Sequence, residues 1–372
     1  MAGEVRQPID VSSLSSYIDA NVPEIKTPID VKQFGYGQSN PTYLLTSVPT
    51  GARFVLRKKP PGQLLSKTAH KVDREYRIIA ALSRHTDVPV PRAYCLCEDD
   101  AVIGTAFYIM EFLDGRIFED PSLPGVSVEE RTEMWHDAIR TLAKFHRVSP
   151  AAVSLSNYGK PSGFFDRQLA TFATISQAQA QTADVETGVP VGKIPHYDDM
   201  SAFFRDAATQ PRDRSGFVHG DYKIDNVVFH KTEPRVVGIL DWEMSTIGHP
   251  LSDLSNLLNP FVTAASGVSI GAGGKGTQTF QPGATPGLPT HDQLVRLYAE
   301  TAGWDPAPDI VWGEAFNLYR GAVILQGIAA RYARRQASSL KAKDYGEGMK
   351  PMGELAWKLV QEIKQGNARS KL

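Results

Sequence analysis

The sequence predicts an α+β protein with two unequal lobes, a small β-rich N-terminal lobe and a larger, mainly helical C-terminal lobe. Short runs of alternating apolar and polar residues, typical of strands, gather before residue 113. Long stretches with helical periodicity follow at 128–146 and 311–337. With 372 residues, 42% of them hydrophobic, the chain is long enough to bury a sizeable core.

Four segments are expected along the chain. Residues 1–29 are interpreted as an N-terminal extension and 30–113 as the small lobe. Residues 114–365 are interpreted as the large lobe. A polar tail, 366–372, completes the sequence.

Each element of the small lobe is predicted from its own pattern. Two apolar runs, 42–45 and 53–57, flank a Pro-Thr-Gly turn and predict a β-hairpin. Residues 70–83 carry apolar side chains on a helical period with charges between them, which predicts an amphipathic helix. A second pair of strands is predicted at 93–96 and 107–112.

The large lobe contains two brief apolar runs, 227–229 and 236–240, that suit strands. Residues 262–290 are rich in Gly, Thr and Pro and predict a long, mobile insertion between helices. Its Gly-Gly-Lys275-Gly run differs from the phosphate-binding order G-x-x-x-x-G-K-[ST], because glycine follows the lysine. We therefore favour a flexible linker over a phosphate loop.

Composition excludes several classes of function. The 40 basic and 41 acidic residues give a net charge of −1, which offers no long-range attraction for nucleic acid or an anionic membrane. No apolar stretch approaches the ~20 residues of a membrane-spanning helix. The two cysteines, Cys95 and Cys97, have no second Cys or His pair nearby, so we expect reduced thiols on a strand.

The strongest chemical signal is the run Val-His-Gly-Asp221-Tyr-Lys-Ile-Asp-Asn226, followed after two strands by Ile-Leu-Asp241-Trp-Glu243. Phosphoryl transfer needs a carboxylate that orients the attacking hydroxyl and accepts its proton, together with oxygen ligands for Mg²⁺. Asp221 suits the first role, and Asn226 and Asp241 suit the second. Glu243 either assists the metal ligands or is exposed to solvent.

This combination, H-G-D-x-x-x-x-N followed by I-L-D-W-E, resembles the aminoglycoside phosphotransferase (APH) branch of the protein-kinase-like fold. The resemblance implies a bilobal kinase-like fold, ATP and Mg²⁺ as cofactors, Asp221 as catalytic base, and Asn226 and Asp241 as metal ligands. A protein kinase itself is disfavoured, because the chain after Asp241 carries no A-P-E-like segment.

The small lobe has the counterparts that such a kinase needs for ATP. A glycine-rich turn, 35–40, precedes Arg57 on a predicted strand and Glu75 on a predicted helix. Protein kinases carry lysine at the position of Arg57, and Lys58 is its neighbour here. Neighbouring strand residues face opposite sides, so one of the two contacts phosphate, and we favour Arg57. The expected ATP-binding residues are Gly37, Gln38, Ser39, Asn40, Arg57, Glu75, Met110, Glu111 and Phe112.

The last three of these, Met110, Glu111 and Phe112, occupy the place of the interlobe hinge. There, backbone groups would read the adenine edge and the two apolar side chains would flank the base. His146, near the end of a predicted helix, is interpreted as structural.

Longer runs, such as Val-Leu-Arg57-Lys-Lys-Pro-Pro-Gly, are similar to the kinase-like N-terminal halves of the large acyl-CoA dehydrogenases. This implies a hydroxylated acyl-CoA or hydroxy fatty acid as substrate. The 372 residues contain no dehydrogenase half. The resemblance therefore implies either a separate acyl-CoA dehydrogenase as partner or a different product. Four arginines near the C-terminal end either meet the phosphates of CoA or form a solvated basic face: Arg320, Arg331, Arg334 and Arg335.

The final residues, Ser370, Lys371 and Leu372, spell a peroxisomal import signal. Peroxisomal localisation and binding to the import receptor are therefore expected, with a cytoplasmic protein as the alternative. Two other functions stay open, namely a kinase for another small alcohol, such as an amino sugar or a choline-like compound, and a catalytically silent nucleotide-binding pseudokinase.

Overall fold

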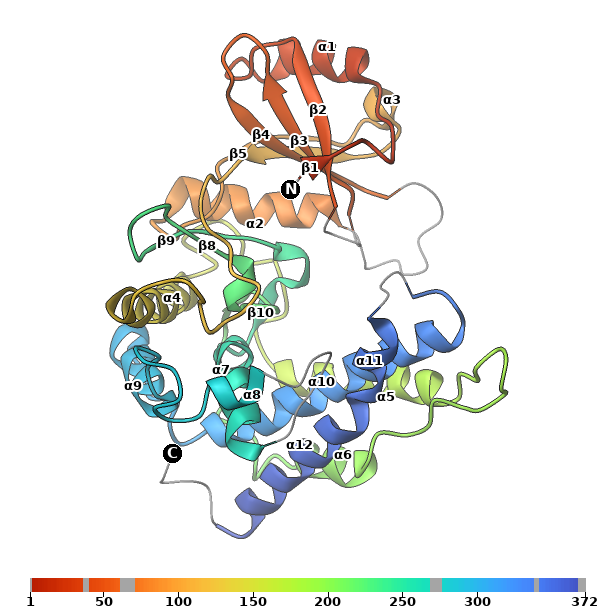
Figure 1. Cartoon of the computed structure of the whole chain (residues 1–372), viewed down its shortest axis with the longest axis vertical. Coiled ribbons are helices and arrows are strands. Elements are labelled where there is room, and N and C mark those ends of the chain that lie inside the picture. Colours follow the sequence, from red (N-terminus) through yellow and green to blue (C-terminus); the bar gives the residue numbers. More distant parts are fainter. Residues whose placement is uncertain (1, 36–39, 61–70, 268–275, 338–340, 367–372) are drawn as a thin grey trace. The chain divides into compact units, whose positions relative to one another are not determined.

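The computed structural model describes residues 2–35, 40–60, 71–267, 276–337 and 341–366 (Figure 1). The chain forms two compact units. One comprises Met1–Ile117, Ala151–Ser156 and Asn226–Ser245, and we call it the sheet unit. The other comprises Phe118–Pro150, Asn157–Asp225 and Thr246–Leu372, and we call it the helical unit. The predicted α+β fold, with a β-rich part followed by a mainly helical part, is confirmed.

The sheet unit is built on an antiparallel sheet of six described strands in the order β1-β2-β3-β4-β6-β5. The predicted hairpin is present, with Leu44 opposite Val55, and the second predicted strand pair is β5 and β6. The strands are β1 (Ala2–Gly3), β2 (Ile29–Phe34), β3 (Thr42–Ser47), β4 (Arg53–Lys58), β5 (Ala93–Cys97) and β6 (Phe107–Glu111).

Three helices accompany this sheet: α1 (Val11–Asn21), α2 (Val72–His85) and the short α3 (Asp100–Ile103). Helix α2 is the predicted amphipathic helix. The side chain of Asp10 caps α1 by accepting a hydrogen bond from the backbone N–H of Ser13. Leu14 and Ile18 of α1 are fully buried in the apolar core that also contains Leu45 of the sheet. Residues 1–29 therefore add to this core, although their sequence suggests an extension.

Both cysteines lie on β5 and are buried as free thiols, as predicted. Burial raises the pKa of Cys95 to about 12. The two thiols are therefore part of the packed interior of the sheet unit.

The predicted strands of the catalytic region are β8 (Val227–Phe229) and β9 (Val236–Ile239), which pair with each other. They belong to the sheet unit, because Arg116 and Phe229 exchange backbone hydrogen bonds of 2.8 and 2.9 Å. Gly115 permits this approach, since a Cβ there would lie 2.3 Å from the carbonyl oxygen of Phe229. The short 3₁₀ turns η1 (Ile224–Asn226) and η2 (Trp242–Met244) flank the hairpin.

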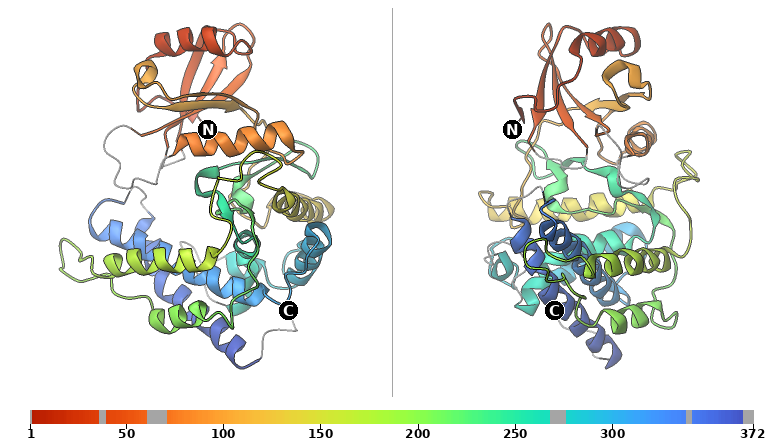
Figure 2. Two further views of the ribbon diagram at one scale, coloured as in Figure 1. Left: turned by 180° about the vertical axis from the view of Figure 1, so that it is seen from behind. Right: turned by 90° about the vertical axis from the view of Figure 1, so that its right-hand side faces the viewer.

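The helical unit packs its helices around α10, which contacts α5, α7, α11 and α12 (Figures 1 and 2). Aromatic side chains fill its core, with the ring of Phe165 4.6 Å from Trp312 and 4.9 Å from Phe316 between centroids. Its elements are α4 (Val128–Arg147), α5 (Phe164–Ala180), α6 (Tyr197–Arg205), β7 (Gly216–Val218), β10 (Thr246–Gly248), α7 (Leu251–Ser266), α8 (Gly276–Thr279), α9 (His291–Ala302), α10 (Ile310–Ala333), α11 (Ala342–Glu347) and α12 (Met349–Lys364). In the described part of the chain, no helix is both long and apolar enough to cross a bilayer.

The expected mobile insertion at 262–290 differs from what the structure contains. Residues 262–266 complete α7, and Phe280 is buried against Trp135 and Phe261, with ring centroids 6.1 and 5.0 Å apart. Arg131 of α4 donates a 2.6 Å hydrogen bond to the carbonyl of Pro286. The buried Phe280 and the hydrogen bond from Arg131 thus hold part of a segment whose composition suggests a linker. Lys275 lies outside the described residues.

Candidate active site

The loop that carries Asp221 follows β7 and is held by Asp253 of α7. The carboxylate of Asp253 accepts hydrogen bonds from the backbone N–H groups of His219, at 2.6 Å, and Gly220, at 2.8 Å. Gly220 has φ of +87°, a conformation that glycine adopts without strain. The backbone next to Asp221 is therefore fixed by a carboxylate that is fully buried.

Asp253 is in turn held by His146. The Nε2 atom of His146 lies 3.2 Å from Asp253, and its Nδ1 lies 2.6 Å from the hydroxyl of Tyr298. Burial by itself would raise the pKa of Asp253, but His146 and the backbone N–H of His219 bring it below its ordinary value. His146 thus positions the loop through Asp253, consistent with a structural role.

Two cations lie close to Asp221. Lys223 Nζ is 3.6 Å from Asp221 Oδ2 and 3.1 Å from Asp225 Oδ2. Burial opposes the charge of Lys223, but these two carboxylates raise its pKa above the ordinary value. Arg320 of α10 donates a 2.5 Å hydrogen bond to the carbonyl of Gly220. The Asp221 side chain remains 35% exposed, so a substrate hydroxyl can reach it.

The hairpin β8–β9 brings the chain at Asn226 beside the chain at Asp241. The backbone N–H of Leu240 donates a 2.8 Å hydrogen bond to the carbonyl of Asn226. Asp241 follows with φ of +64°, an uncommon conformation for a residue other than glycine. Its side chain is 39% exposed. An amide and a carboxylate thus leave the same end of one hairpin.

A buried polar cluster surrounds Glu75 in the sheet unit. Its carboxylate contacts Arg57 Nη1 at 2.8 Å and accepts hydrogen bonds from Asn40 Nδ2, at 2.7 Å, and from the hydroxyl of Tyr108, at 2.9 Å. Burial raises the pKa of the Glu75 carboxyl, whereas Arg57 and Tyr108 act to lower it. Three donors therefore compensate one buried carboxylate.

Arg57 also faces the carboxylates that follow β9. Its Nη1 is 3.5 Å from Asp241 Oδ1, and its Nη2 is 3.9 Å from Glu243 Oε2. The Nε atom of Arg57 is buried and has no hydrogen-bond partner among the described residues. Lys58 instead has its ammonium 5.8 Å from the ring centroid of Tyr43, and burial lowers its pKa. Between these two neighbours, Arg57 is the one that pairs with Glu75, as expected.

The expected hinge lies at the end of β6. The backbone N–H of Glu111 already donates a 2.8 Å hydrogen bond to Arg92, so this group is not available to adenine. Met110 is buried, and the guanidinium of Arg53 lies 4.2 Å from the ring centroid of Phe112. The roles of Met110, Glu111 and Phe112 stay predictions.

The structure divides the predicted residues between the two units. Asp221 belongs to the helical unit, whereas Arg57, Glu75, Asn226 and Asp241 belong to the sheet unit. Gly37, Gln38 and Ser39 lie outside the described residues, as do Ser370, Lys371 and Leu372.

Sequence reasoning missed two residues of the site, Lys223 and Asp253, and it named Arg320 only as one of four arginines near the C-terminal end. Lys223 is inside the run that identifies the catalytic loop, so its charge was visible there. Asp253 acts from 32 residues further along the chain than Asp221, and no local pattern marks it.

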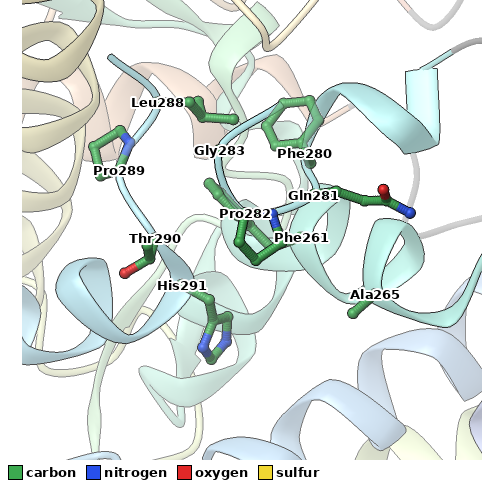
Figure 3. Close-up of a pocket in the computed structure, with 10 residues that line it drawn as sticks. All are labelled: Phe261, Ala265, Phe280, Gln281, Pro282, Gly283, Leu288, Pro289, Thr290 and His291. Carbon is green, nitrogen blue, oxygen red and sulfur yellow. The ribbon is translucent and has the colours of Figure 1, made fainter. Parts of the chain in front are cut away.

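A small cavity of about 40 Å³ lies between the end of α7 and the segment that leads into α9 (Figure 3). That volume holds on the order of one or two water molecules. Its lining is mainly apolar and includes Phe261, Phe280 and Leu288. None of its lining residues is a predicted site residue, so the cavity is part of the packing around Phe280.

The sheet unit with its Arg57–Glu75 pair, followed by the loop of Asp221 and the β8–β9 hairpin, is typical of a phosphotransferase of the kinase-like class. The chain belongs to the phosphotransferase enzyme (APH) family, whose sequence profile matches residues 30–294. The predicted family is therefore confirmed.

The curated relatives of this chain are named as acyl-CoA dehydrogenases. A probable acyl-CoA dehydrogenase of Arabidopsis thaliana is 38% identical over 91% of this chain and 40% of its own length. Acyl-CoA dehydrogenase family member 11 of Rattus norvegicus is 34% identical over 98% of this chain and 45% of its own length. The chain thus spans less than half the length of these relatives.

Solved structures agree with the fold. A candidate aminoglycoside phosphotransferase of Ralstonia eutropha JMP134 is 36% identical, with a TM-score of 0.79 over 95% of this chain and 99% of that one. A spectinomycin phosphotransferase, solved with ADP and spectinomycin, covers 95% of this chain at 13% identity and a TM-score of 0.58. The second likeness concerns the fold alone.

Proposed function

We propose that this protein is an ATP-dependent phosphotransferase that phosphorylates the hydroxyl of a small molecule, and that the acceptor is a hydroxyacyl-CoA or a hydroxy fatty acid. The observation that carries the proposal is the catalytic loop, where Asp253 holds the backbone beside an accessible Asp221 and Lys223 lies 3.6 Å away. Family membership supports phosphoryl transfer. The ATP and AMP-PNP complexes of solved members of the fold support ATP as donor.

In the proposed reaction, Asp221 accepts a hydrogen bond from the acceptor hydroxyl and takes its proton. The hydroxyl oxygen forms a bond to the γ-phosphorus, the bond from that phosphorus to the bridging oxygen of the β-phosphate breaks, and ADP leaves. Lys223 supplies positive charge beside the reacting groups.

The residues of the sheet unit fit a magnesium nucleotide. Asn226 and Asp241 offer an amide oxygen and a carboxylate from one hairpin end, a donor set that suits Mg²⁺ when phosphate oxygens and water complete its shell. The ion would neutralise phosphate charge when bound. Arg57 has an unpartnered buried Nε, and this free donor supports its assignment to the phosphates.

Two observations favour an anionic acceptor. The curated relatives are named acyl-CoA dehydrogenases, and the groups next to Asp221 include the cations Lys223 and Arg320. If the chain ends at Leu372 in the cell, the terminal Ser-Lys-Leu would direct it to the peroxisome through the import receptor. A separate acyl-CoA dehydrogenase would then act on the phosphorylated product.

The test is ADP release by the purified protein with Mg–ATP across 3-, 4- and 5-hydroxyacyl-CoA species, free hydroxy acids, choline and an aminoglycoside. Stimulation by hydroxyacyl-CoA alone, lost in Asp221→Asn, is the expected result and would identify the position of the hydroxyl. Stimulation by choline or the aminoglycoside would show that the acceptor is another small alcohol and would contradict the proposed hydroxyacyl-CoA. Binding of ATP without turnover on any acceptor would indicate a pseudokinase.

A further inference from the structure

Helix α10 is buried along most of its surface but keeps one exposed face. Ile324 is 48% exposed, although it lies in a helix whose other apolar residues are largely buried. Arg320, Ile324, Ile328 and Arg331 are spaced by four, four and three residues, so they lie on one face of the helix. We call this face the α10 strip. Ile328 is partly exposed and Arg331 is exposed.

Close-packed helices border the strip on both sides. At Gly321, an added Cβ would lie 2.3 Å from Met352 Sδ of α12. At Gly327, an added Cβ would lie 2.6 Å from Gln179 Nε2 of α5. With about 100° per residue, the two glycines lie about 60° to either side of Ile324 around the helix axis. Side chains of α5 and α12 therefore pack against α10 at these two glycines, yet neither helix covers Ile324.

The strip begins at the catalytic loop. Arg320 donates its hydrogen bond to the carbonyl of Gly220, the residue before Asp221. A ligand with its hydroxyl at Asp221 would therefore meet α10 at this end, where the exposed Ile324 and the partly buried Ile328 follow. This continuity with the proposed catalytic base separates the strip from an ordinary apolar surface.

The other end of the strip is cationic. Arg331 and Arg334 are exposed, and neither forms an ion pair with any residue in the described ranges. Arg335 differs, because it pairs with Asp184 at 2.8 Å and Glu186 at 2.6 Å. From Arg320 to Arg331, eleven residues of helix span about 17 Å. A ligand that meets both ends must be long, with an anionic group far from its hydroxyl.

We propose that the α10 strip binds the CoA part of a hydroxyacyl-CoA, with the pantetheine arm along Ile324 and Ile328 and the phosphates at Arg331 and Arg334. This inference rests on the proposed function. Charge complementarity favours it, since a polycationic aminoglycoside would be repelled by the two arginines and an anionic nucleotide end would be attracted. The isoleucines suit the methyl and methylene groups of pantetheine.

The first test measures binding of coenzyme A itself by calorimetry, which does not depend on turnover. Wild-type protein should bind coenzyme A with an affinity that falls as salt rises. Arg331→Glu/Arg334→Glu should weaken binding roughly tenfold or more. Lys350→Glu/Lys358→Glu, the same change of charge at two exposed positions of α12, is the matched control and should bind like wild type. Equal affinity in all three proteins would overturn the proposal.

The second test compares two thioesters of one hydroxy acid, the CoA ester and the N-acetylcysteamine ester, which lacks the phosphates and most of the arm. Arg331→Glu/Arg334→Glu and Ile324→Ser/Ile328→Ser should raise KM for the CoA ester roughly tenfold and leave KM for the truncated ester and kcat unchanged. Arg331→Lys, which keeps the positive charge, should keep a KM for the CoA ester close to that of wild type. An unchanged KM for the CoA ester would refute binding of CoA by the α10 strip while leaving the proposed function intact. Failure of wild-type protein to phosphorylate any hydroxyacyl-CoA would refute the proposed function instead.

Discussion

Replacing Arg57 by methionine should destabilise the sheet unit in a pH-dependent way. The substitution leaves Glu75, which is 1% exposed, with only the neutral donors Asn40 and Tyr108. Removing one partner of a buried ion pair costs about 3–5 kcal/mol, because the other charge stays buried and uncompensated. We expect a loss of that size in the free energy of unfolding at pH 8.

The pH dependence follows from the pKa of Glu75. Burial already raises this pKa, and the loss of Arg57 removes the main opposing influence, so the pKa rises further. Between the unfolded pKa of about 4.3 and this higher folded value, the folded protein holds a proton that the unfolded chain has lost. Stability of Arg57→Met relative to wild type should therefore be nearly normal at pH 4 and fall as pH rises through the folded pKa.

Urea unfolding followed by circular dichroism at pH 5 and pH 8 measures both effects. Tyr108→Phe removes the other group that lowers the pKa of Glu75, so it should show the same direction of pH dependence with a smaller loss, about 1–2 kcal/mol at pH 8. Arg57→Met/Glu75→Gln should recover at least half of the loss at pH 8, because no buried charge remains. The reasoning is refuted if Arg57→Met loses the same stability at both pH values, or if the double variant is as unstable as the sum of the single variants.

Three further predictions concern the proposed chemistry and the packing. Asp221→Asn should abolish turnover and leave the affinity for ATP within twofold of wild type, as measured by fluorescence titration. Retained turnover would show that Asp221 is not the catalytic base. Asp241→Ala should abolish the magnesium-dependent part of nucleotide affinity, so an unchanged affinity for Mg–ATP would contradict its assignment. Gly115→Ala should lower the free energy of unfolding by about 1–3 kcal/mol, since its Cβ would meet the Phe229 carbonyl at 2.3 Å. Gly3→Ala is the control, because no atom lies within 4 Å of its Cβ, and it should leave stability unchanged. Thermal unfolding measures both variants.

The sequence predicts most directly the placement of residues that lie within one contiguous run. Asp221 and Asn226 lie in one loop, and Asp241 ends a strand that pairs with the strand after Asn226. A strand pattern together with a spacing of residues is therefore enough to place Asn226 and Asp241 at one end of the β8–β9 hairpin. The choice between Arg57 and Lys58 also follows from strand alternation, once the partner Glu75 is known to lie on one side.

What could not be predicted depends on tertiary contacts. Asp253 holds the catalytic loop through two backbone N–H groups, and nothing near it in the sequence marks that role. The membership of 226–245 in the sheet unit depends on the close approach of Gly115 to Phe229, more than a hundred residues away. Composition likewise gave no sign that Phe280 would anchor its segment between Trp135 and Phe261.

The two buried thiols of β5 make the chain well suited to spectroscopic labelling. Maleimide reagents attack thiolates that solvent can reach, and Cys95, with its pKa raised to about 12, is buried beside an equally buried Cys97. A cysteine introduced at an exposed position, such as Ile324→Cys, would therefore react far faster than either native thiol. A fluorophore attached there would report on the surface of α10 without any need to remove the native cysteines from the core of the sheet unit.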